Sequence, residues 1–93
     1  MASQAQFRLG EAYLGNENKE QAVLQFSRVV YLFPQQSELI EEALLKLGPL
    51  YMEEKKFSEA RQVYRKLLEK TRREDRREGA KKMLDQINQG VVR

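Results

Sequence analysis

The feature that most constrains this chain is an internal repeat, seen when Gly10 is aligned with Gly48, an offset of 38 residues. The aligned segments match small residues with small ones, aromatic residues with aromatic ones and basic residues with basic ones. The matched pairs include Ala5 with Ala43, Leu9 with Leu47, Tyr13 with Tyr51, Ala22 with Ala60 and Phe26 with Tyr64. A period of this length is typical of repeat proteins, in which each unit buries its apolar face against its neighbours. The sequence therefore predicts a duplicated unit with a partial third one.

Each unit is predicted to contain two helices, because apolar residues recur at helical spacing and no stretch alternates between apolar and polar. Gly15 suits a helix C-terminus, and Pro34 ends a helix because the residue before proline avoids the α conformation. Helix starts are predicted at capping side chains: Asn18 (with Gln21), Ser37, Ser58 and Asp75 (with Glu78). The predicted helices cover about residues 2–15, 18–33, 37–53, 58–71 and 75–90. The expected fold class is all-α.

The composition excludes most kinds of catalytic and metal chemistry. The 93-residue chain has no Cys and no His, so it lacks thiols, the commonest general base and the commonest metal ligand. It also has no glycine-rich phosphate loop, zinc-ligand spacing or calcium-binding loop. We therefore expect no catalytic residues, no metal site and no cofactor. We expect no transmembrane segment either, because no run approaches ~20 consecutive apolar residues.

The chain resembles the tetratricopeptide repeat (TPR) family at two places, each with a Leu-Gly pair, a tyrosine, an alanine and an aromatic residue. The first set is Leu9, Gly10, Tyr13, Ala22 and Phe26, closed by Pro34; the second is Leu47, Gly48, Tyr51, Ala60 and Tyr64. Gln6 and Leu44 stand where the family usually has an aromatic residue before the Leu-Gly pair, and Arg72 replaces the second proline.

This resemblance implies antiparallel helix pairs stacked as a solenoid. The expected organisation is a single domain over residues 1–93, with one repeat at 3–36, a second at 37–73 and a C-terminal capping helix at 74–90. Helical periodicity begins almost at Met1, which suggests a fragment of a longer protein. The segment from Pro34 to Gly48 is similar to bacterial cell-envelope TPR proteins, which implies the periplasm or envelope; without that likeness the cytoplasm is the alternative.

The resemblance also implies a function, that of a non-catalytic scaffold or adaptor that binds a protein partner. In TPR proteins the first helix of each pair lines a concave groove for a peptide or helix. The residues predicted to face this groove are Gln4, Phe7, Glu11, Leu14, Glu42, Leu45, Pro49, Met52, Lys82 and Gln86. The competing interpretation is that the apolar members of this set pack against a neighbouring helix or repeat.

Two alternatives come from other classes of function. The net charge is +3, and the basic excess lies in the second half of the chain, so the C-terminal helices could contact phosphates through Lys66, Lys70, Arg73, Arg76, Arg77 and Lys81. Interleaved acids and the lack of aromatic residues for base stacking disfavour nucleic acid as the partner. The other alternative is a self-assembly module, a homo-oligomer formed through exposed repeat ends.

Overall fold

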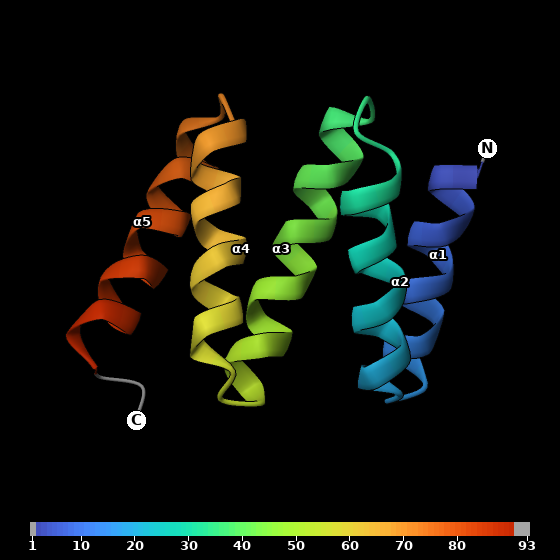
Figure 1. Cartoon of the computed structure of the whole chain (residues 1–93), viewed down its shortest axis with the longest axis horizontal. Coiled ribbons are helices and arrows are strands. Elements are labelled where there is room, and N and C mark those ends of the chain that lie inside the picture. The colour runs from blue at the N-terminus through green and yellow to red at the C-terminus, as the bar shows by residue number, and fades with distance from the viewer. Residues whose placement is uncertain (1, 91–93) are drawn as a thin grey trace. The chain divides into compact units, whose positions relative to one another are not determined.

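The computed structural model describes residues 2–90, and these form five α-helices and no strand (Figure 1). The helices are α1 (Ala2–Gly15), α2 (Lys19–Leu32), α3 (Ser37–Glu53), α4 (Phe57–Lys70) and α5 (Glu74–Gln89). The all-α fold class is confirmed. The boundaries follow the sequence closely because glycine, proline and polar residues fall between the periodic segments.

The chain forms two compact units that divide inside α3, between Leu47 and Gly48. The first unit holds α1, α2 and the first part of α3. Its helices α1 and α2 pack against each other as an antiparallel pair. The second unit holds the rest of α3 together with α4 and α5, and here α4 packs against α5.

The starts of α2 and α4 are capped differently, although the two helices are equivalent in the repeat. The predicted cap of α2 is confirmed, since the Gln21 N–H donates to Asn18 Oδ1 at 3.3 Å. The predicted start of α4 at Ser58 is wrong, because Lys56 occupies the N-cap without a side-chain hydrogen bond. Lys56 stands 38 residues after Asn18, so the repeat period places this start better than the residue type does.

Other helix ends differ from the predicted ones by one or two residues. Helix α5 begins at Glu74 rather than at Asp75, and its N-cap is Arg73, whose N–H donates to Thr71 Oγ1 at 3.1 Å. Gly15 is still helical, and the left-handed residue after α1 is Glu17, with φ of 61°. The matching residue after α3, Lys55, has φ of 60°. The two turns therefore repeat the same backbone conformation without glycine.

The core of the first unit centres on the ring of Phe26, which is fully buried. The Phe7 ring lies 5.3 Å from it, centroid to centroid, with the two planes tilted by 59°. A Cβ placed on Gly10 would come within 2.8 Å of Phe26 Cε1. The glycine is therefore needed because α1 and α2 approach closely at this ring. The ring that the glycine faces lies one turn after the small residue Ala22 on α2.

The core of the second unit repeats this arrangement with Tyr64 in the place of Phe26. A Cβ on Gly48 would come within 2.6 Å of the Tyr64 hydroxyl oxygen, so the Tyr64 ring lies against this glycine. Burial of the phenol raises the pKa of Tyr64 above its usual 10.0. The Arg77 guanidinium joins α5 to α4, because its Nη1 donates to the carbonyl oxygen of Leu68 at 2.9 Å.

Candidate functional site

The predicted groove residues of the first unit come from α1 and from the first part of α3. On α1, Gln4 and Glu11 are exposed and Leu14 is half-buried. On α3, Leu45 is exposed and Glu42 is half-buried. The set combines polar or charged side chains with two leucines.

Phe7 differs from the other predicted groove residues. Its side chain is only 8% exposed, because its ring packs on Phe26 in the α1–α2 core. The family resemblance placed Phe7 in the groove because its position on the first helix is not one that the repeat uses for packing. The structure gives Phe7 a packing role, and any contact with a partner is limited to the small fraction of its surface that remains open.

Gln6 belongs to a polar network that sequence reasoning missed. Gln6 Nε2 donates to Oε1 of Gln25, a residue of α2 that is buried. Gln25 Nε2 in turn lies 3.5 Å from Gln21 Oε1. Buried amides need such partners, since an unsatisfied buried polar group costs about 1–3 kcal/mol. The signal that could have revealed this network is the polar Gln6 at a position where the family usually has an aromatic residue.

The predicted residues of the second unit lie on the last part of α3 and on α5. Pro49 is exposed and Met52 is half-buried on α3, while Lys82 and Gln86 are exposed on α5. Lys82 borders an open hollow of about 460 Å³ along α5. The hollow mixes both signs of charge, being lined by Asp75, Glu78, Gly79, Lys81, Lys82 and Asp85. It suits a polar ligand surface better than an apolar anchor.

The basic side chains of α4 and α5 are not equally available to a polyanion. Lys70, Arg73 and Lys81 are exposed. Arg77 is half-buried and its guanidinium is bound to the last turn of α4, where cations are favourable. Arg77 is thus explained by helix packing, which weakens the sequence argument for a phosphate-binding surface.

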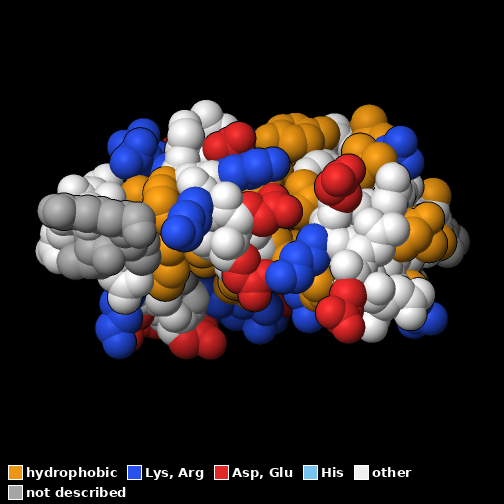
Figure 2. Space-filling view, turned by 90° about the horizontal axis from the view of Figure 1, so that it is seen from below, with side chains coloured by type: hydrophobic (Ala, Val, Ile, Leu, Met, Phe, Trp, Pro, Cys, Tyr) orange, Lys and Arg blue, Asp and Glu red, His pale blue; other side chains and the backbone are white. Residues whose placement is uncertain are grey.

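A group of exposed apolar residues on α2 was not predicted. Leu24 is 41% exposed, Tyr31 69% and Leu32 62%. The equivalent positions on α4 are the exposed residues Gln62, Glu69 and Lys70. Figure 2 shows that hydrophobic side chains reach the surface between charged ones on the face it presents. The signal in the sequence was the helical phase of Leu24 and Tyr31, which is opposite to that of Phe26.

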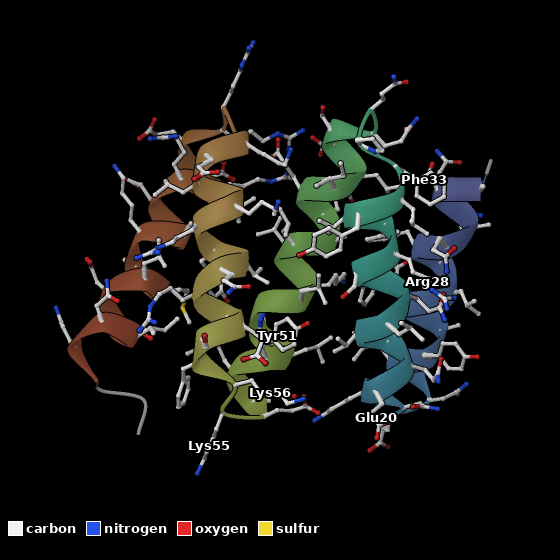
Figure 3. All side chains as sticks on the ribbon, in the orientation of Figure 1. Glu20, Arg28, Phe33, Tyr51, Lys55 and Lys56 are labelled. Carbon is white, nitrogen blue, oxygen red and sulfur yellow. The ribbon has the colours of Figure 1, made fainter. Side chains whose placement is uncertain are left out.

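A smaller hollow lies at the connection between α2 and α3. It has a volume of about 290 Å³ and is lined by Leu32, Phe33, Pro34, Gln35 and Gln36. Figure 3 shows Phe33 at this end of α2. The lining combines apolar and amide side chains and includes the exposed Leu32.

Within residues 2–90, no group of three or more carboxylates is placed to hold a metal ion. Over the same residues, no helix combines the length and apolar character needed to cross a bilayer.

Comparison with known proteins places these helices in a family. The tetratricopeptide repeat family matches over residues 4–35 and again over 42–70, and the match includes both Gly-to-ring crossings. Curated proteins and solved structures gave no match to the chain. The two matched segments cover most of α1 to α4, with α5 as an additional C-terminal helix. The chain belongs to the tetratricopeptide repeat family, whose repeats generally serve as protein-interaction modules and are typically non-catalytic.

Proposed function

We propose that this protein is a non-catalytic scaffold that binds a peptide or helix of another protein along the first helices of its repeats. The observation that carries the proposal is the set of open side chains on α1 and α3 that core packing does not use. Leu14 and Leu45 supply apolar surface there, while Gln4 and Glu11 are exposed polar residues of α1. Apolar anchors of this kind usually carry most of the energy of an interface.

The proposed organisation is a single TPR domain over residues 1–93. Its repeats span 3–36 and 37–73, and its capping helix spans 74–90. The family match over residues 4–35 and 42–70 supports the two repeats.

Charge sets the kind of peptide that each unit would accept. The first unit offers Glu11 and Glu42 beside its leucines, so it favours a peptide with Lys or Arg next to an apolar residue. In the second unit, Lys82 favours an acidic residue. Met52 offers a flexible apolar contact that adapts to different side chains.

The test is selection from a random peptide library displayed on phage, with the full chain as the target. Selected peptides should bind Leu45→Glu and Met52→Ala variants at least tenfold more weakly. The control is Gln62→Glu, which also changes an exposed helical residue but lies on α4. Phe7→Ala is a poor test, because losing its packing on Phe26 also weakens the fold.

Peptides that bind both groove variants as tightly as they bind the parent chain would contradict the proposal. A library that yields no peptide above background would count against it too. Glu11→Lys provides a further check, because it should reverse the charge preference of the peptides selected by the first unit.

A further inference from the structure

The outer face of α2 combines an apolar centre with charges of opposite sign on either side. Glu20, Leu24 and Arg28 are spaced by four residues, so they lie along one face of the helix. Both charged residues are exposed, and Figure 3 shows them extending from α2. Tyr31 continues the same face toward the end of the helix.

This face follows the repeat pattern only at Arg28. The buried positions of α2 and α4 match, with Ala22 and Phe26 equivalent to Ala60 and Tyr64. On the outer face Arg28 is matched by the basic Lys66, but three positions differ. Glu20, Leu24 and Tyr31 correspond to Ser58, Gln62 and Glu69. An exposed leucine and tyrosine where the second repeat is polar indicate an interaction surface rather than a requirement of the fold.

We propose that the outer face of α2 binds a second copy of this chain, with the two α2 helices antiparallel and related by a two-fold axis at Leu24. Glu20 and Arg28 lie about 6 Å before and after Leu24 along the helix axis, at 1.5 Å per residue. The two-fold therefore brings Glu20 level with Arg28 of the partner subunit, and Arg28 level with the partner's Glu20. Leu24 meets its own copy at the centre.

The order of the charges favours a second copy over an unrelated partner. A two-fold interface must be self-complementary, because each contact occurs twice with the roles exchanged. Glu20 and Arg28, equidistant from Leu24, meet this condition only when the helices are antiparallel. A parallel pair would place Glu20 level with Glu20 and Arg28 level with Arg28, which is repulsive.

The expected dimer is weak and depends on concentration. One helix face is smaller than the ~800 Å² per partner of a standard stable interface, so the dissociation constant should exceed about 1 μM. The surface is distinct from the α1 and α3 residues proposed for peptide binding. Peptide binding can therefore fail while dimerisation succeeds, and the reverse.

The first test is sedimentation equilibrium of the full chain over a range of concentrations. Leu24→Glu should weaken the dimer at least tenfold, while Gln62→Glu, the matched change on α4, should leave it unchanged. A parent chain that stays monomeric up to about 1 mM would overturn the proposal. A Leu24→Glu variant that dimerises like the parent would overturn it as well.

Charge reversal tests the antiparallel register. Glu20→Arg and Arg28→Glu should each weaken the dimer several-fold, and the double variant should restore it to within about threefold of the parent, because the pairs reform with exchanged signs. A double variant weaker than either single one overturns the register. All these positions are exposed, and thermal melts would verify that each variant is folded.

Covalent trapping gives a readout that does not depend on affinity. The chain has no Cys, so Leu24→Cys introduces a single thiol on each copy. A short bismaleimide should then link two copies of Leu24→Cys and leave Gln62→Cys monomeric. Equal cross-linking of the two variants would show that the copies meet by chance and would refute the two-fold at Leu24.

Discussion

In both repeats two helices approach closely where a glycine faces an aromatic ring, but the ring differs between the repeats. Gly10 lies against Phe26 and Gly48 lies against Tyr64, at equivalent positions in sequence. The hydroxyl of Tyr64 is near the Gly48 backbone, a contact for which Phe26 has no counterpart. The comparison teaches that the glycine and the presence of a ring are required by packing, whereas the polar group on that ring can vary.

A third helical glycine sharpens this comparison. A Cβ on Gly79 of α5 would meet nothing within 4 Å, unlike one on Gly10 or Gly48. Glycine inside a helix costs about 1 kcal/mol relative to alanine. At Gly10 and Gly48 the close helix contact compensates for that cost, while no such contact exists at Gly79.

The largest effect is expected from removing a ring. Phe26→Ala should lower the free energy of unfolding by about 3–5 kcal/mol, because the ring is fully buried and leaves a cavity beside Phe7 and Gly10. Urea denaturation measures the change. Tyr64→Ala should fall in the same range, and a cost for either variant of less than about 1 kcal/mol would contradict the proposed equivalence of the two rings.

Overpacking a helix crossing should have the next largest effect. Gly48→Leu adds a side chain where the Tyr64 ring already lies, and it should destabilise the protein by about 1–3 kcal/mol. Gly10→Leu should do the same against Phe26. Thermal unfolding followed by circular dichroism tests both, and an unchanged midpoint for either variant would show that its crossing is looser than described.

The opposite sign is expected at the open glycine. Gly79→Ala should stabilise the protein by about 0.4–1 kcal/mol, because alanine favours the helix and restricts the unfolded chain without meeting a neighbour. The same chemical denaturation measures it. A loss of stability here would remove the distinction between packed and open glycines.

The smallest expected effect is a pH dependence of stability that comes from Tyr64 and that Phe26 cannot contribute. The pKa of Tyr64 is raised in the folded protein, so above about pH 10 the phenol ionises in the unfolded chain before it ionises in the folded one. The unfolded state then binds fewer protons, and stability falls as pH rises. Tyr64→Phe should show a shallower loss above about pH 10 in denaturant titrations. Identical slopes for variant and parent would exclude this contribution.

The sequence predicted the helices well because the periodic apolar positions and the Gly and Pro residues agree with one another. It predicted the helix starts less well at Lys56 and Arg73, since neither side chain caps its helix. The start of α4 at Lys56 follows the repeat period, since Lys56 is equivalent to Asn18. The start of α5 at Arg73 is accompanied by the hydrogen bond from the Arg73 N–H to Thr71.

The surface was harder to predict than the core. Phe7 was assigned to a groove because of its place in the motif, but its ring packs on Phe26, while Gln6 next to it is bonded to Gln25. Leu24 and Tyr31 were not singled out, because apolar residues on a predicted helix are first assigned to packing. Only the three-dimensional arrangement shows that they lie outside the core.

Helix α3 belongs to both compact units, and this has a consequence for how the protein unfolds. The portions on either side of the division, Ser37–Leu47 and Gly48–Glu53, are each shorter than the ~12–15 residues that an isolated helix needs to be marginally stable in water. Cleaving the chain between Leu47 and Gly48 would leave two short portions of α3 that unfold separately. Unfolding of one portion of α3 therefore destabilises the other portion. Amide hydrogen exchange should show that the residues on both sides of Leu47 and Gly48 open together, rather than in two independent unfolding events.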